Sequence, residues 1–350
     1  MKSIPFSRAS IDKNEISAVE KILKSGWLTM GEETRMFEEE FANYVKARHA
    51  ISVNSCTSAL FLALKALKIQ KGNEVILPSF TFAATANVVI HCGATPVFVD
   101  INNKDLTIDQ KSFEKALTKR TKAVMPVHYA GNRALIKTNL PIIEDSAHLI
   151  PKAGDNKNSF ASCYSFYATK NMTTGEGGMI TTNDENISDW FKKARLHGLS
   201  RDAWKRYSLK SKWIYEIEFS GYKLNTTDIN SAIGRVQLKK LDNFEKKRQK
   251  TVKLYNKLLG LNNKGTHLYP ILVDKRDKFF EYMKKKGIGC SFHFTPLHLQ
   301  PAYKEFNMQK LPITEYVGSR VVTLPLDAVI TEEEVRYVCE AVSDFRKINK

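Results

Sequence analysis

The stretch AISVNSCTSALFLALKAL, residues 50–67, sets the architecture of this 350-residue chain. Its first four residues, Ala50–Val53, predict a short strand. From Thr57 onward, apolar residues recur at helical spacing and predict a helix with one apolar stripe, formed by Leu60, Leu64 and Leu67. A strand followed at once by a helix is typical of proteins with parallel sheets.

The same alternation continues on the C-terminal side of this stretch. Strands are expected at 74–77, 96–99, 123–127 and 142–143, and helices at 81–90 and directly after Asp109, which can cap a helix. Short apolar strands separated by helices predict an α/β fold with a mainly parallel sheet covered on both faces. The connection 129–141 is short for a parallel crossover, so a very short helix or a loop is expected there.

The C-terminal part has a different pattern. A helical pattern runs from Asp228 to about Leu259, longer than most globular helices, and is expected to link the large domain to a smaller one. A strand at 269–273, a helix at 277–286 and a capping box at Thr331 and Glu334 complete a small α+β domain. We therefore place a large domain at 1–240 and a small one at 241–350.

Composition narrows the class of protein. The 54 basic and 37 acidic residues give a formal net charge of +17, which suits either an acidic ligand or a lysine-rich solvated surface. The charged runs 245–248 and 284–286 are interpreted as helix surface. Five scattered cysteines argue against a disulfide framework or a zinc site, and no metal is expected. Without a signal peptide or a long apolar run, the chain is expected to be cytoplasmic.

Three short segments carry residue types suited to chemistry. Residues 54–60, NSCTSAL, place small hydroxyl residues at a helix start, which predicts either an anion site or a plain helix cap. Asp145 follows a buried strand and is either a ligand-facing acid or a helix cap. Lys170 precedes the glycine-rich turn 175–178 and is either a buried reactive amine or a surface lysine. Together they supply the groups that hold pyridoxal phosphate (PLP): a phosphate cup, a carboxylate and an amine.

These segments belong to a longer series of motifs, found at 25–29, 78–87, 93–100, 144–148, 165–171, 221–228 and 296–303. With this series the chain resembles, nearly end to end, the DegT/DnrJ/EryC1/StrS family of nucleotide-sugar aminotransferases. The resemblance implies the fold type I, aspartate-aminotransferase-like architecture of PLP enzymes, with PLP as the cofactor.

The resemblance also implies roles around the cofactor ring. Lys170 would form the Schiff base and then move the proton between C4′ and the substrate carbon. Asp145 would pair with the pyridine nitrogen. Phe82 would stack on one face of the ring and Ala147 would pack on the other. His148, where many relatives have Gln, would reach the phenolic oxygen.

Further implied roles concern the phosphate and the sugar. The phosphate would be held by Cys56, Thr57, Ser58 and Ser165, and by Asn225 of the neighbouring subunit, which implies a homodimer with shared active sites. Contacts to the sugar are implied for Trp27, Thr29, His293 and His298. For Trp27 a core aromatic, and for the two histidines a satisfied core position, stay open as alternatives. The segment 201–213, rich in bases and aromatics, would embrace a nucleotide diphosphate or form a dimer contact.

The implied reaction transfers an amino group from L-glutamate to a UDP- or dTDP-linked 4-keto-6-deoxyhexose. The product would be a 4-amino-4,6-dideoxy sugar for polysaccharide or glycan biosynthesis. A 3-keto-sugar aminotransferase stays open. A sugar dehydratase of the same fold is disfavoured, because such relatives carry His in place of Lys170. A nucleic-acid-binding role finds no supporting motif. The short 131–141 connection, a compact 268–274 and Asp327 depart from the family pattern, and they bear on specificity and packing.

Overall fold

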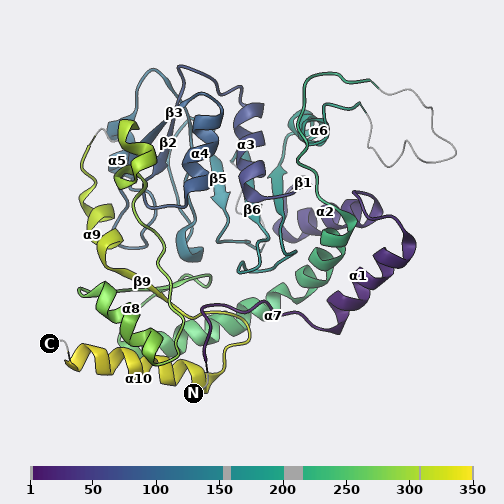
Figure 1. Ribbon diagram of the computed structural model, residues 1–350. Coiled ribbons are helices and arrows are strands. Elements are labelled where there is room, and N and C mark those ends of the chain that lie inside the picture. Colours follow the sequence, from purple (N-terminus) through teal and green to yellow (C-terminus); the bar gives the residue numbers. More distant parts are fainter. Residues whose placement is uncertain (1–2, 153–158, 201–215, 307–308, 349–350) are drawn as a thin grey trace.

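The computed structural model describes residues 3–152, 159–200, 216–306 and 309–348 (Figure 1). Its large domain contains a four-stranded ladder in the order β1-β7-β6-β5 and a three-stranded ladder in the order β3-β2-β4. Parallel bridges from Val124 to Ile142 and from Val127 to Asp145 join the two ladders into one sheet. The strands are β1 (His49–Val53), β2 (Glu74–Pro78), β3 (Thr95–Val99), β4 (Thr121–Val124), β5 (Ile143–Ser146), β6 (Ala161–Ser165) and β7 (Gly178–Thr182).

The predicted mainly parallel sheet is confirmed, with one exception. Strand β7 runs antiparallel to both of its neighbours, β1 and β6. The β2–β3, β2–β4 and β5–β6 pairs are all parallel. Parallel strands bring their carboxyl ends to one edge of the sheet, where α/β proteins bind their ligands.

Helices cover both faces of this sheet (Figure 1). On one face α3 (Cys56–Ala66), α4 (Ala83–His91) and α6 (Glu185–Ala194) share a buried apolar cluster with the strands. On the other face α2 (Glu32–Val45) contributes Phe37 and Phe41 to a second cluster. The two faces alternate along β6, since Cys163 lies in the first cluster and Tyr164 in the second. Helices α1 (Lys13–Ser25) and α5 (Gln110–Ala116) complete the large domain.

The long predicted helix is present as α7 (Asp228–Leu259), 32 residues without interruption. Its first half packs on the large domain through Leu238 and Leu241, and its second half packs on the small domain through Val252 and Tyr255. The predicted boundary at 240/241 therefore falls inside one helix. The small domain consists of the antiparallel pair β8 (Tyr269–Leu272) and β9 (Val321–Leu324) with α8 (Arg276–Lys285), α9 (Pro312–Arg320) and α10 (Glu332–Ile348). Both ends of the described chain lie beside this domain, and Ile4 belongs to its core.

Local predictions can be checked against these elements. Thr331 and Glu334 form the predicted capping box, with bonds of 2.8 and 3.2 Å, and Asp109 caps α5. The 129–141 connection holds only a single 3-10 turn (Tyr129–Gly131), as its shortness indicated. The strand expected at 123–127 ends earlier, at Val124. Among the described helices, none is both long and apolar enough to span a bilayer.

Candidate active site

Asp145 lies on β5, near the carboxyl end of the parallel strands. Its side chain is 5% exposed; Oδ2 accepts a hydrogen bond from Thr85 Oγ1 at 2.8 Å, and Oδ1 accepts one from the Ala147 amide at 3.1 Å. Burial raises the pKa of Asp145, while these two hydrogen bonds and the charge of Lys170 act in the opposite direction. A carboxylate held in this way can pair with a protonated ring nitrogen.

Lys170 lies in the loop between β6 and β7. Its backbone amide donates to Tyr167 O at 2.9 Å, but Nζ makes no hydrogen bond or ion pair within the described ranges. Burial lowers the pKa of Lys170, although the charges of Asp145 and Cys56 oppose the shift. A desolvated amine with a lowered pKa is a competent nucleophile and proton carrier.

Helix α7 makes two hydrogen bonds to the backbone of the Lys170 loop. Arg248 donates to the carbonyl oxygen of Asn171, and Thr173 N donates to Gln237 Oε1 at 3.4 Å. The interpretation of Arg248 as helix surface is therefore wrong, because the residue is only 5% exposed. Its charged neighbours hid the fact that Arg248 faces inward. Helical spacing could have indicated this, because Arg248 lies four residues after the apolar Phe244 on the same helix face.

The predicted phosphate cup lies at the start of α3. Ser55 caps the helix by accepting a hydrogen bond from Ser58 N at 3.1 Å, and this leaves the amides of Cys56 and Thr57 without an intrahelical acceptor. Thr57 is exposed, whereas Cys56 is buried and burial raises the pKa of its thiol. A Cβ on Gly178 would lie 2.4 Å from the Ser55 carbonyl carbon, so β7 passes directly against this turn. The geometry combines a helix cap with free amide donors.

Two further predicted phosphate residues lie at chain turns. Ser165 is buried at the end of β6, and its Oγ accepts from Tyr167 N at 3.4 Å. Asn225 lies just before α7, where its Oδ1 accepts from Lys223 Nζ at 2.6 Å. Both phosphate assignments stay predictions.

Phe82 and Ala147 are the predicted neighbours of the ring faces. Phe82 directly precedes α4 and is 63% exposed, with its ring 6.1 Å from that of Phe294. Ala147 is half-buried and follows β5. The exposed ring of Phe82, the buried amine of Lys170 and the carboxylate of Asp145 together fit a planar cationic ring that carries an aldehyde.

His148 presents a defined hydrogen-bond donor. The Ala130 amide donates to His148 Nδ1 at 3.3 Å, and burial lowers the pKa of His148 well below its usual value. The ring is therefore neutral, with its proton on Nε2. The buried His267, which sequence reasoning missed, lies against it with ring centroids 4.4 Å apart.

The two histidines predicted to contact the sugar differ. His298 is buried between Ser79 Oγ, 2.6 Å from Nδ1, and a Glu315 carboxylate oxygen, 3.3 Å from Nε2. These contacts favour the core interpretation for His298. His293 Nδ1 lies 3.0 Å from Thr323 Oγ1, and burial lowers its pKa to about 4.

The loop between α1 and α2 carries the other two predicted sugar contacts. Thr29 is exposed and pairs with Thr227, and Trp27 is half-buried against Gly31. The segment 201–213 lies outside the described residues. Within the ranges the structure describes, no group of His, Cys, Asp or Glu side chains is arranged to hold a metal ion.

Comparisons with known proteins identify relatives of the whole chain. SpsC, a spore coat polysaccharide biosynthesis protein of Bacillus subtilis, is 41% identical, and the match covers 98% of this chain and 97% of SpsC. Spr1654 of Streptococcus pneumoniae, assigned as a sugar aminotransferase and solved in PLP and PMP forms, is 31% identical in its PMP form with a TM-score of 0.88, covering 97% of this chain and 98% of that one. PseC of Helicobacter pylori, an aminotransferase involved in the biosynthesis of pseudoaminic acid, is 30% identical with a TM-score of 0.88, covering 98% of this chain and 99% of that one.

The alignment with SpsC spans 383 positions, more than the 350 residues of this chain, so the chain lacks segments that SpsC has. The sequence profile of the DegT/DnrJ/EryC1/StrS aminotransferase family matches residues 9–343. The chain therefore belongs to the DegT/DnrJ/EryC1/StrS family and is a PLP-dependent sugar aminotransferase.

Proposed function

We propose that this enzyme transfers the amino group of L-glutamate to C4 of a nucleotide-linked 4-keto-6-deoxyhexose. The product is a 4-amino-4,6-dideoxy sugar on UDP or dTDP, used for a polysaccharide or another glycan. The names of SpsC and PseC, which concern coat polysaccharide and pseudoaminic acid, support a sugar acceptor of this class. The observation that carries the chemistry is the desolvated amine of Lys170, which has no hydrogen-bond partner among the described residues and lies within electrostatic reach of Asp145.

The residues around the ring have separable tasks. PLP, when bound, supplies an electron sink for the substrate carbon. Lys170 Nζ, whose pKa is lowered by burial, takes and returns the proton at that carbon. Asp145 holds a proton on the pyridine nitrogen through its charge. His148 donates its Nε2 hydrogen to the phenolic oxygen, because Nδ1 is already occupied by the Ala130 amide.

Binding and orientation come from the surrounding turns. The free amides at the start of α3, with Thr57 and Ser58, bind the cofactor phosphate at the positive end of the helix. Phe82 orients the ring and shields one face from water. The working unit in this proposal is a homodimer, in which Asn225 reaches the partner's phosphate. The cytoplasmic location stays a prediction.

An absorbance titration tests the cofactor site and the donor together. Purified enzyme is loaded with PLP, and its visible band is followed while L-glutamate is added. The band is expected to bleach, and D-glutamate serves as the control. Lys170→Ala is expected to keep the wild-type circular dichroism and to lose turnover. A yellow enzyme that ignores L-glutamate would exclude it as the donor.

The acceptor is tested with the glutamate-treated enzyme. UDP- and dTDP-linked 4-keto-6-deoxyhexoses and a dTDP-linked 3-keto-6-deoxyhexose are added separately. The 4-keto sugars are expected to restore the visible band, and NMR of the product locates the new amine. Recovery with the 3-keto sugar alone would replace the C4 assignment by C3.

A further inference from the structure

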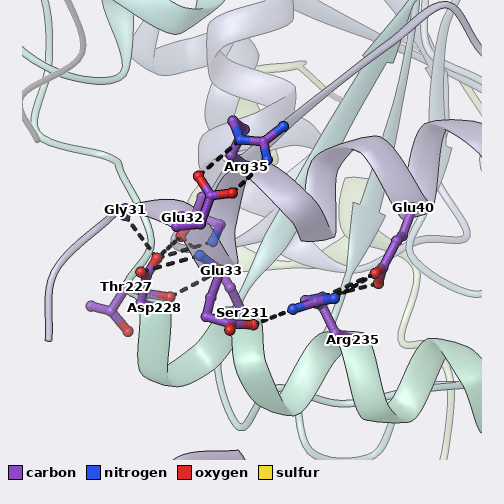
Figure 2. Close-up of polar contacts among 10 residues, drawn as sticks. Gly31, Glu32, Glu33, Arg35, Glu40, Thr227, Asp228, Ser231 and Arg235 are labelled. Carbon is purple, nitrogen blue, oxygen red and sulfur yellow. Dashed lines mark hydrogen bonds and ion pairs between the residues drawn. The ribbon is translucent and has the colours of Figure 1, made fainter. Parts of the chain in front are cut away.

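The start of α7 and the start of α2 are joined by one buried carboxylate, that of Asp228, which is 3% exposed. Its Oδ1 accepts from Gly31 N at 2.7 Å, Thr34 N at 3.0 Å and Thr34 Oγ1 at 2.7 Å, and its Oδ2 accepts from Glu33 N at 3.3 Å (Figure 2). Helix α2 has no side-chain cap of its own, because Gly31 occupies the N-cap position. Asp228 therefore supplies the cap of α2 from a residue almost 200 positions later in the chain.

The same carboxylate borders the loop that precedes α2. A Cβ on Gly31 would lie 2.4 Å from Trp27 Nε1 and 2.7 Å from Asp228 Oδ2, so the indole and the carboxylate flank one small space that only glycine leaves open. The backbone adds a second tie, because Asp228 N donates to Thr29 O at 3.2 Å and Thr29 pairs with Thr227. The loop carrying Trp27 and Thr29 is thus fixed to the start of α7 at Thr29 and at Gly31.

We propose that Asp228 is a positioning residue for acceptor binding. It holds the Trp27–Thr29 loop in register with the segment that carries Asn225, three residues before it. This inference rests on the proposed function, since it takes the Trp27–Thr29 loop to contact the sugar. Asp228 acts through the loop and touches none of the reacting atoms, so it affects the sugar half of the reaction and leaves the glutamate half unchanged.

A neighbouring contact provides a matched control. Arg235, two turns further along α7, joins the same two helices through Glu40, with bonds of 2.7–3.1 Å, and through Glu33 (Figure 2). None of these bonds reaches the Trp27–Thr29 loop. Arg235→Gln therefore weakens the α2–α7 contact without releasing the loop.

The kinetic test compares Asp228→Ala, Asp228→Asn and Arg235→Gln, with Trp27→Ala as the reference for loss of the loop contact. Asp228→Ala and Trp27→Ala are expected to raise KM for the keto-sugar about tenfold, the size of effect that follows loss of buried hydrogen bonds. Asp228→Asn keeps an acceptor oxygen and is expected to stay within about threefold of wild type. Arg235→Gln is expected to keep the wild-type KM. Asp228→Ala, Asp228→Asn and Arg235→Gln are expected to bleach with L-glutamate at the wild-type rate.

Gly31→Ala covers the case in which Asp228→Ala does not fold. The added methyl group displaces Trp27 and leaves the Asp228 side chain chemically intact, so the same rise in KM is expected. An unchanged KM in Gly31→Ala and in folded Asp228→Ala would overturn the inference. So would an unchanged KM in Trp27→Ala, or an equal rise in Arg235→Gln.

Hydrogen exchange measures, without any substrate, how firmly Asp228 holds the Trp27–Thr29 loop. The amides of residues 27–34 are expected to exchange about tenfold faster in Asp228→Ala and at the wild-type rate in Arg235→Gln. Unchanged exchange rates in Asp228→Ala would show that Asp228 does not hold the loop, even if KM for the keto-sugar rose. A wild-type enzyme that transfers no amine to any nucleotide-linked keto-sugar would instead overturn the proposed function, and the exchange result would still decide whether Asp228 holds the loop.

Discussion

A single residue, Lys170, lowers the stability of the folded protein. Its amine is desolvated and has no hydrogen-bond partner in the described chain. Burial lowers its pKa below the ordinary 10.5, so the unfolded state binds more protons than the folded state. Stability attributable to this residue is therefore lowest at low pH, and it rises with pH between the lowered pKa and 10.5. Cofactor-free Lys170→Met is expected to melt about 2 °C or more above cofactor-free wild type at neutral pH.

Thermal unfolding of both cofactor-free proteins from neutral to alkaline pH checks this expectation. The difference should shrink as pH approaches 10.5, where the amine of the unfolded chain also loses its proton. Equal melting temperatures at every pH would show that burial of the amine carries no cost.

Thr85 is a second residue-scale contributor, since its Oγ1 donates to Asp145 at 2.8 Å and lowers the pKa of that carboxyl. Thr85→Val removes a hydrogen bond to a charged group and is expected to slow the glutamate half-reaction about tenfold, measured by stopped-flow bleaching. Thr81→Val is the control, because Thr81 contacts Thr85 and makes no bond to Asp145. Equal rates of bleaching in wild type, Thr85→Val and Thr81→Val would show that Thr85 does not contribute to the glutamate half-reaction.

Among the secondary-structure elements, α2 and α7 pack closely enough to require glycine. A Cβ on Gly234 of α7 would lie 2.6–3.0 Å from ring atoms of Phe37, which is 2% exposed and packs against the rings of Phe41 and Phe166. Gly234→Ala is therefore expected to destabilise the protein by about 1–3 kcal/mol, despite the better helix propensity of alanine. Urea denaturation checks the value, with the exposed Lys239→Ala as the control expected within about 0.5 kcal/mol of wild type. A more stable Gly234→Ala would mean that the two helices separate easily.

Signals confined to a few residues explain what the sequence could predict at this scale. The 50–67 stretch predicted β1 and α3 because strand and helix periods differ, and Asp109 and Thr331 predicted their caps because capping partners lie within three residues. The motif order also brought Asp145 and Lys170 together. The cap that Asp228 places on α2, the Arg248–Asn171 bond and the Thr85–Asp145 bond join residues 60 or more positions apart, and such contacts leave no periodic mark in a single sequence.

At the scale of the whole molecule, two segments connect the large domain to the small one, and one of them contacts the Lys170 loop. Helix α7 runs from the large domain to the small one, and on the way its Arg248 binds the loop carbonyl of Asn171. The N-terminal segment makes a second connection, since Arg8 donates to Asp327 at 3.1 Å and to Glu334 at 3.0 Å in the small domain. Helix α7 and the N-terminal segment therefore both contact the small domain, and helix α7 also binds the Lys170 loop.

If the two subunits share their active sites, a prediction follows that can be tested only on the assembled dimer. In the proposed dimer, each site takes Lys170 from one subunit and Asn225 from its partner. Lys170→Ala and Asn225→Asp, which places a carboxylate against the phosphate, are each expected to be inactive. Unfolding and refolding them together at equal amounts makes half of the dimers hybrids with one intact site each, so about a quarter of wild-type activity is expected to return. Two affinity tags isolate the hybrid, and an inactive hybrid would show that each chain completes its own site.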